Sequence, residues 1–216
     1  MIGDLLPACV ASVAAHGDDP AGYLLPEEAA QFGWAVEGRR REFTTARTCA
    51  RRALGELGLR EVPILRGRMR QPLWPSGVVG SITHCPGYRA AAVASEPDML
   101  TIGIDAEIHD ELPPGVLDHV AIAPERAWLA SAPRDWICWD RLLFCAKESV
   151  YKAWFPLTGR WLGFDEALVT FDPGCGTFHA RLLVTPPTVA GRELTGFDGR
   201  FAVRDGLVIT AVALAQ

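Results

Sequence analysis

The chain has almost no lysine. Of its 21 positively charged residues, only Lys147 and Lys152 are lysines, and the others are arginines. Its six cysteines show no C-x-x-C spacing and no regular framework, so free thiols in a reducing compartment fit best. No apolar run is long enough to span a membrane. A net charge of -5 argues against nucleic-acid binding by the protein as a whole. We therefore expect a cytoplasmic globular protein that binds neither nucleic acid nor a membrane.

The order of helix and strand signals predicts an α+β fold. The 216 residues suffice for one large domain or two closely packed lobes. Each half offers a long helix followed by strands, which predicts two similar lobes in a pseudo-twofold arrangement, 1–100 and 101–216. Helices are predicted from Pro26, over 39–57 and over 135–154, with a short one in the Pro-rich loop 109–134. Strands are predicted over 62–65, 78–84, 88–94, 99–108, 167–171, 178–184, 197–204 and 207–214.

Three local signals sharpen these bounds. Pro156 is expected to end the long helix, because the residue before a proline disfavours the helical conformation. Cys85-Pro86-Gly87 is typical of a hairpin turn, and Asp205-Gly206 predicts the turn of the last hairpin. The expected elements therefore end at residues whose backbone preferences are known.

The segment Gly103-Ile-Asp-Ala-Glu107 places two carboxylates on one face of a strand, because side chains at i and i+2 point the same way. Adjacent carboxylates repel unless they are solvated, share a proton or hold a cation. Such a pair, with positions left for phosphate oxygens and water, is a common magnesium site. For this motif alone, the plainer alternative of a strand with its polar face in solvent is favoured.

The predicted helix around Lys147 and Lys152 carries a second candidate group. Glu148 and Lys152 share a helix face, so Glu148 could complete a metal site or act as a general base. Lys152 could neutralise or protonate a leaving phosphate, because the pKa of a lysine shifts readily where that of an arginine does not. The plainer alternative is a surface ion pair worth about 0.2–0.5 kcal/mol.

Histidine and arginine supply candidate phosphate contacts. His84 ends a strand just before a Pro-Gly turn, where its side chain can reach a phosphate, although a lone histidine is more often structural. Residues 39–52 hold six arginines and one glutamate, and Arg40, Arg47 and Arg51 fall on one helical stripe. A solvated basic face usually explains such a run. In an acidic chain it also suits a small polyanionic ligand held by bidentate guanidinium groups.

Together these segments resemble the 4′-phosphopantetheinyl transferase superfamily, in its longer two-lobed class that activates surfactin and enterobactin synthetases. The resemblance rests on Gly80-Ser-Ile-Thr-His-Cys85, Gly103-Ile-Asp-Ala-Glu107 and Phe144-Cys-Ala-Lys-Glu-Ser-Val-Tyr-Lys152. Two further stretches, Lys152 to Phe164 and Arg39-Arg-Arg-Glu-Phe43 with Arg47, are most similar to the actinobacterial members.

The resemblance implies that phosphopantetheine is transferred from coenzyme A (CoA) to a serine of an apo acyl or peptidyl carrier protein, with release of 3′,5′-ADP. It implies a monomer with CoA in a cleft between the lobes. The implied Mg²⁺, or Mn²⁺, ligands are Asp105, Glu107, Glu148 and the Ala106 carbonyl. The implied catalytic residues are Glu148 as candidate base, Lys152 at the departing phosphate, and His84. The implied CoA contacts are Arg39, Arg47, Arg66, Thr83, His84, Asp105, Lys147, Glu148 and Lys152. The family often has lysine near position 66, where this chain has arginine.

Two other functions remain open at this point. A Mg²⁺-dependent phosphoesterase or nucleotidyl transferase would use the same carboxylates and turn over CoA or a nucleotide without a carrier protein. A non-catalytic module that binds CoA or a carrier would show no metal-dependent turnover, and the presence of Glu148 and Lys152 argues against it.

Overall fold

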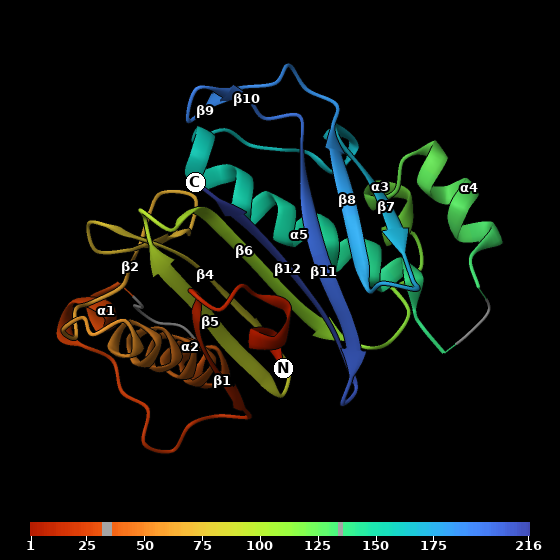
Figure 1. Ribbon diagram of the computed structural model, residues 1–216. Coiled ribbons are helices and arrows are strands. Elements are labelled where there is room, and N and C mark those ends of the chain that lie inside the picture. Colours follow the sequence, from red (N-terminus) through yellow and green to blue (C-terminus); the bar gives the residue numbers. More distant parts are fainter. Residues whose placement is uncertain (32–35, 134–135) are drawn as a thin grey trace.

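The computed structural model describes residues 1–31, 36–133 and 136–216 and has the predicted α+β architecture of two lobes (Figure 1). Each lobe packs one 20-residue helix against an antiparallel sheet, α2 (Glu37–Glu56) in the first lobe and α5 (Trp139–Thr158) in the second. The first sheet has the strand order β1-β5-β4 and the second β6-β12-β11-β8-β7. The two-lobed α+β prediction is confirmed, whereas the pseudo-twofold relation between the lobes stays a prediction.

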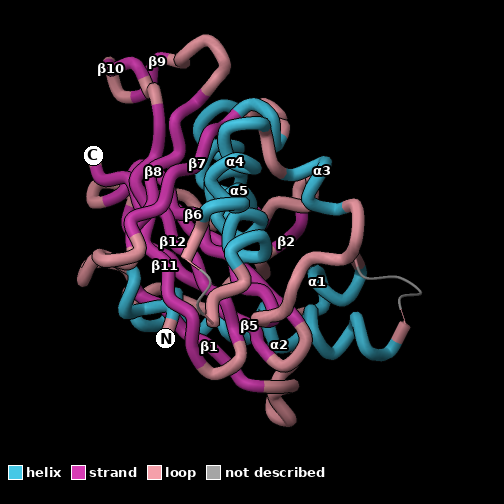
Figure 2. The backbone as a smooth tube through the Cα atoms, turned by 90° about the vertical axis from the view of Figure 1, so that its right-hand side faces the viewer, coloured by secondary structure: helices cyan, strands magenta, loops and turns pink. Residues whose placement is uncertain are grey.

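The strands of the described residues form two larger sheets and two small hairpins. The first sheet holds β1 (Ala11–His16), β4 (Val78–Cys85) and β5 (Tyr88–Ser95), and the second holds β6 (Met99–Ile108), β7 (Ala167–Asp172), β8 (Thr177–Leu182), β11 (Gly196–Arg204) and β12 (Leu207–Ala215). The hairpins are β2 (Leu65–Arg66) with β3 (Pro72–Leu73), and β9 (Thr188–Val189) with β10 (Arg192–Glu193). The shorter helices are α1 (Pro26–Ala30), α3 (Val116–Val120) and α4 (Ala123–Ser131), with 3-10 turns η1 (Ile2–Leu5) and η2 (Phe164–Glu166). Helices α3, α4 and α5 gather on one side of the five-stranded sheet (Figure 2).

The predicted turns are confirmed, and their backbones explain the residues found there. Gly87 has a φ of +80° in the turn between β4 and β5. Asp205 and Gly206 have φ values of +53° and +73° between β11 and β12, the left-handed pair that a two-residue turn requires. Strand β6 has the predicted bounds, Met99–Ile108.

The predicted end of the long helix is wrong, because α5 continues through Pro156 to Thr158 and is capped by Gly159, whose φ is +64°. Proline removes one helical hydrogen bond but is tolerated where packing holds the chain. Here Trp154 is fully buried, and its indole N–H donates to the carbonyl of Arg160 at 2.9 Å. The predicted start at Asp135 lies outside the described residues, and α5 begins at Trp139.

Two further expectations need correction. The described part of the loop predicted over 109–134, residues 109–133, contains two helices, α3 and α4, instead of one. Of the strand predicted over 62–65, only Leu65 is extended in a ladder, because the backbone N–H of Ile64 donates to the Glu28 carboxylate and not to a neighbouring strand.

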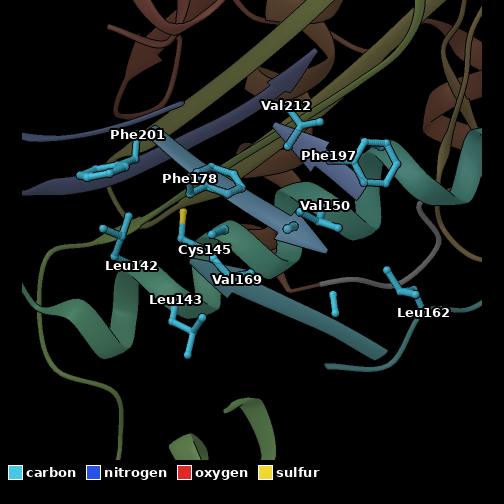
Figure 3. Close-up of a cluster of buried hydrophobic side chains, with 14 of the residues drawn as sticks. Leu142, Leu143, Cys145, Val150, Leu162, Val169, Phe178, Phe197, Phe201 and Val212 are labelled. Carbon is cyan, nitrogen blue, oxygen red and sulfur yellow. The ribbon is translucent and has the colours of Figure 1, made fainter. Parts of the chain in front are cut away.

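The described residues form three hydrophobic cores, of which one lies between the lobes. One lies between α5 and the five-stranded sheet and includes Leu142, Val150 and Phe197 (Figure 3). A second lies between α2 and the first sheet. A third lies between the lobes, where Ile102 and the alternate residues of β6 meet the N-terminal segment and β5. Strand β6 therefore presents one face to the interlobe core and the other, with Gly103, to α5.

Gly103 lets α5 lie directly against β6. A Cβ at this position would be 1.9 Å from the carbonyl oxygen of Ser149 and 2.7 Å from the backbone nitrogen of Ala153. Beside it, the Thr101 hydroxyl donates to the Ala153 carbonyl at 2.8 Å. This close approach holds the second half of α5 against the strand that carries the D-x-E pair.

Replacing Gly103 by alanine is expected to destabilise the protein by about 1–3 kcal/mol or more, because the clashing atoms are backbone and cannot rotate away. The matched control is Gly55→Ala in α2. Apart from the adjoining backbone of α2, none of the described atoms would lie within 4 Å of the added Cβ, and alanine is expected to stabilise the protein by about 0.5–1 kcal/mol. Urea unfolding of both variants would measure the two effects, and a Gly103→Ala midpoint at or above that of the parent would contradict the close approach.

The cysteines and the helix lengths bear on the predicted redox compartment and on membrane insertion. All six cysteines are free thiols, as predicted. Across the described ranges, none of the helices is both long and apolar enough to cross a membrane.

Candidate active site

Strands β4 and β6 belong to different sheets but lie side by side where the lobes meet (Figure 1). Two side-chain hydroxyls of β4 join them. The Ser81 hydroxyl accepts the N–H of Ile104 at 3.1 Å, and the Thr83 hydroxyl accepts the N–H of Ala106 at 3.1 Å. Both hydroxyls are buried, so they satisfy backbone donors of β6 that water cannot reach. We call this pair of contacts the hydroxyl seam.

Asp105 lies beside this seam and faces α5. Its side chain is only 5% exposed, so the alternative of a solvated strand face is wrong for this residue. Its Oδ1 accepts hydrogen bonds from the Thr83 hydroxyl at 3.0 Å and from Lys152 Nζ at 2.7 Å. Its Oδ2 is buried and has no hydrogen-bond partner among the described residues. A buried acceptor without a donor is costly, so this oxygen is a candidate ligand for a cation.

Lys152 pairs with Asp105 across the helix–strand contact. Its Nζ also donates to the carbonyl of Ile104 at 3.1 Å. Burial acts to lower the pKa of Lys152, but the Asp105 carboxylate outweighs it and the pKa is raised. The ammonium is therefore held charged, which favours an electrostatic role over proton donation. The surface-pair alternative is also wrong, since the partner of Lys152 is Asp105 of another element rather than Glu148.

Glu107 and Glu148 add negative charge around Asp105. Burial is the main cause that raises the pKa of each carboxyl group, and the charge of Asp105 raises both further. Glu107 accepts a hydrogen bond from Arg141 Nη1 at 3.3 Å. Three acidic groups from one strand and one helix are thus electrostatically coupled, which is the setting in which a cation is stabilised.

Arg141 is a site residue that the sequence reasoning missed. It also donates to the carbonyls of Asp110 and Glu111 at 2.9 and 2.8 Å, so it fixes the loop after β6. It lies seven residues before Glu148 on α5, two turns along the same helix face. That spacing was a usable signal in the sequence.

The donor set can be tested against magnesium. Within the described ranges, no three or more His, Cys, Asp or Glu side chains are arranged as a metal site. Magnesium is usually bound by one or two carboxylates together with substrate phosphates and water, so a complete protein cage is not required. The partnerless Asp105 Oδ2 and the neighbouring Glu107 fit such a cation, and Glu148 contributes charge.

Lys147 has a different place from the expected CoA contact. Its side chain is 3% exposed, and Nζ donates to the Val120 carbonyl at 2.9 Å, the Glu125 carboxylate at 2.7 Å and the Phe164 carbonyl at 2.6 Å. All three donors of the ammonium are thereby used. Glu125 in turn accepts the backbone N–H of Val169 at 2.8 Å. This buried pair and its contacts join α3, α4, α5, η2 and β7. Because all three donors are used, Lys147 has none left for a ligand.

Thr83 and His84, adjacent on β4, differ in exposure. Thr83 is 1% exposed and its hydroxyl is occupied by the seam, so the expected direct contact of its side chain with CoA does not fit. The His84 side chain is exposed. Partial enclosure of the ring by protein is the main cause that lowers the pKa of His84, and the charge of Lys152 lowers it further. His84 therefore lies near the Asp105–Lys152 pair, and its exposed ring is able to contact a ligand.

The predicted arginine stripe is divided between structural and candidate ligand roles. Arg51 is buried and forms ion pairs with Glu28 and Glu61, so it belongs to the fold. Arg47 is buried over the ring of Phe43 at 4.3 Å, and its Nε donates to the Ile64 carbonyl at 2.7 Å. Burial lowers the pKa of Arg47 to about 10.

Arg66 approaches the same aromatic ring, with its guanidinium carbon 4.2 Å from the ring centre of Phe43. Phe43 therefore brings Arg47 and Arg66 together although the two lie 19 residues apart in the sequence. Arg39 is exposed in the first turn of α2. Of the arginines expected at a ligand, the structure gathers Arg47 and Arg66 at one place.

A hollow of about 100 Å³ lies beside Glu148. Its walls are largely apolar, with Tyr151, Trp161 and Phe164 among them. Trp161 is 65% exposed and its ring centre is 4.9 Å from that of Tyr151. A larger open groove, about 460 Å³, lies over β7, β8 and β11, and none of the three site carboxylates lines it. The smaller hollow is therefore the one that belongs to the candidate site.

Comparisons with known proteins bear on the same residues. The model of the 4′-phosphopantetheinyl transferase N-terminal domain matches residues 27–94, and that of the 4′-phosphopantetheinyl transferase superfamily matches 101–194. The chain is 55% identical to the 4′-phosphopantetheinyl transferase Svp of Streptomyces mobaraensis, over 100% of this chain and 89% of that protein. It is 51% identical to Npt of Nocardia iowensis over the full length of both, and 47% identical to PptT of Mycobacterium tuberculosis over 99% and 98%. The chain belongs to the 4′-phosphopantetheinyl transferase superfamily.

Proposed function

We propose that this protein transfers 4′-phosphopantetheine from CoA to the serine hydroxyl of an apo acyl or peptidyl carrier protein. The serine oxygen forms a bond to the phosphorus that carries pantetheine, the pyrophosphate bond to the nucleotide breaks, and 3′,5′-ADP leaves. Family membership supports the reaction class. The observation that carries the proposal is Asp105 at the junction of the lobes, whose buried Oδ2 has no partner among the described residues. Its Oδ1 pairs with Lys152, and its charge is coupled to that of Glu148.

Each charged group has a role in this reaction. Asp105, Glu107, Glu148 and the Ala106 carbonyl would hold Mg²⁺ or Mn²⁺. The bound cation would neutralise pyrophosphate charge. Lys152, kept charged by Asp105, stabilises the phosphate that departs with the nucleotide. Glu148, with its raised pKa, is the candidate base for the serine proton.

The remaining contacts follow the shape of CoA. Arg39, Arg47, Arg66 and His84 face the nucleotide and its phosphates. The uncharged pantetheine arm enters the apolar hollow by Tyr151 and Trp161. In this division the lobe of residues 1–100 supplies nucleotide contacts and the lobe of residues 101–216 supplies the metal and the catalytic groups. The protein acts as a monomer. Its place is the cytoplasm, a reducing compartment with which its six free thiols agree.

The arginine assignment predicts a difference between two ligands. CoA carries a 3′-phosphate that dephospho-CoA lacks, and a hydrogen bond to a charged group is worth about 1.5–3 kcal/mol. Arg66→Ala should therefore raise the dissociation constant of CoA about 10–100-fold and that of dephospho-CoA much less. Calorimetric titration of both ligands measures this, with the exposed neighbour Arg68→Ala as the matched control. Equal losses for both ligands would place Arg66 away from the 3′-phosphate.

A transfer assay tests the function itself. The protein is incubated with CoA, Mg²⁺ and an apo carrier protein, and the carrier is weighed by mass spectrometry. The expected result is one phosphopantetheine added to the carrier serine, absent with a carrier in which that serine is alanine and absent in EDTA. Release of 3′,5′-ADP without any carrier would instead support a phosphoesterase. Tight CoA binding with no metal-dependent turnover would support a binding module.

A further inference from the structure

Thr83 connects the two lobes at the candidate metal site. It lies on β4 of the first lobe, and its hydroxyl accepts the Ala106 N–H of β6 at 3.1 Å. The same hydroxyl donates its single proton to Asp105 Oδ1 at 3.0 Å. The side chain is 1% exposed, so it is enclosed by protein on all sides. The backbone N–H fixes the orientation of the hydroxyl, and the hydroxyl in turn fixes the carboxylate.

The two oxygens of Asp105 are treated unequally. Oδ1 receives two donors, one from Thr83 of the first lobe and one from Lys152 of α5. Oδ2 is buried and receives none from the described residues. A carboxylate pinned at one oxygen from two directions cannot turn freely about its side-chain torsion. Its second oxygen is therefore kept in a constant direction, available to a cation.

We propose that Thr83 is a positioning residue that orients the Asp105 carboxylate for the divalent cation. It touches neither substrate nor cation and acts through Asp105. The inference rests on the proposed function and deepens it, because the first lobe then shapes the metal site as well as the nucleotide site. Partners that orient a metal ligand in this way typically contribute about 10–100-fold to metal affinity.

The hydroxyl seam provides its own control in Ser81. Ser81 stands two residues before Thr83 on the same strand, is buried, and accepts the N–H of Ile104 at 3.1 Å. It makes the same kind of bond to β6, and among the described residues none of the carboxylates forms a hydrogen bond with it. Ser81→Ala therefore removes one seam contact while the Thr83–Asp105 contact stays in place. A loss of Mn²⁺ affinity in both Ser81→Ala and Thr83→Val would come from the broken seam. A loss in Thr83→Val alone would come from the freed Asp105 carboxylate.

The test measures Mn²⁺ binding by electron paramagnetic resonance in the protein–CoA complex, with no carrier protein present. Thr83→Val is expected to weaken Mn²⁺ about 10–100-fold. Thr83→Ser keeps the hydroxyl and should bind Mn²⁺ nearly as the parent does, and Ser81→Ala should do the same. With a carrier added, Thr83→Val should raise the KM for Mg²⁺ more than it lowers kcat at saturating Mg²⁺. Should Thr83→Val fail to fold, Thr83→Ala, which leaves a smaller side chain, is measured in its place.

Parent-like Mn²⁺ affinity in Thr83→Val, or equal weakening in Ser81→Ala, would overturn the positioning role. Failure of the parent protein to modify any carrier would overturn the proposed function and leave this comparison of Mn²⁺ affinities intact. A Thr83→Ser variant as weak as Thr83→Val would show that side-chain volume, not the hydroxyl, matters, and would also overturn the inference.

Discussion

Replacing Asp105 by asparagine is expected to lower kcat for phosphopantetheine transfer about 10²–10³-fold, the usual cost of removing one positioned electrostatic group. Asparagine keeps the shape of the side chain and an acceptor oxygen for Thr83 and Lys152. It removes the charge that holds the Lys152 ammonium and that the partnerless Oδ2 offers to a cation. The protein should therefore remain folded and lose turnover.

The measurement is kcat at saturating CoA, carrier and Mg²⁺, with the circular dichroism spectrum as a check on folding. Asp198→Asn serves as the control, because it removes the same charge from an exposed position on β11 that none of the three site carboxylates adjoins. Near-parental turnover of Asp105→Asn would show that the Asp105 charge is not part of the reaction.

Lys147→Met is expected to reduce the free energy of unfolding by about 3–5 kcal/mol, because it leaves the buried Glu125 carboxylate without its ammonium. Replacing both members, Lys147→Met with Glu125→Gln, should cost less than the sum of the two single changes, since no unpaired charge is then left inside. Urea unfolding of the three variants measures these differences.

The same variants separate the structural role of Lys147 from the CoA contact that the family resemblance implies. A ligand-binding lysine would change the KM for CoA and leave the unfolding midpoint nearly unchanged. If Lys147 is structural, the unfolding midpoint should fall while the KM for CoA of the folded protein changes little. An unfolding midpoint equal to that of the parent would instead favour the role of Lys147 as a CoA contact.

The sequence was sufficient for features that depend on neighbouring residues. The bounds of β6, the Pro86-Gly87 and Asp205-Gly206 turns and most of α2 follow from alternation, periodicity and backbone preference. The identities of Asp105 and Lys152 as candidate site residues came from the side-chain chemistry, strengthened by the family resemblance. These are the cases in which the information lies within a few residues of the element concerned.

Partners from distant elements could not be predicted. Lys147 and Lys152 are equally charged and five residues apart, yet one meets Glu125 of α4 and the other Asp105 of β6. Helix spacing shows that they leave α5 in different directions but not what lies there. Thr83 was expected to contact CoA because the motif includes it, whereas its hydrogen bonds go to Asp105 and Ala106. The helix end at Pro156 failed for a related reason, since the buried Trp154 overrides a local preference.

The interlobe core has a consequence for how the chain can be cut. The two matched family models end at residue 94 and begin at residue 101, so by comparison the protein looks like two modules in series. Yet the interlobe core combines side chains of the N-terminal segment, β5, β6 and β12. A fragment ending at residue 98 would expose the apolar face of β5, and its complement would expose the N–H groups that Ser81 and Thr83 accept. The two halves match separate family models but share one core, so neither is expected to fold alone. This suits the protein to a split-enzyme reporter whose activity returns only when two fused partners bring the halves together.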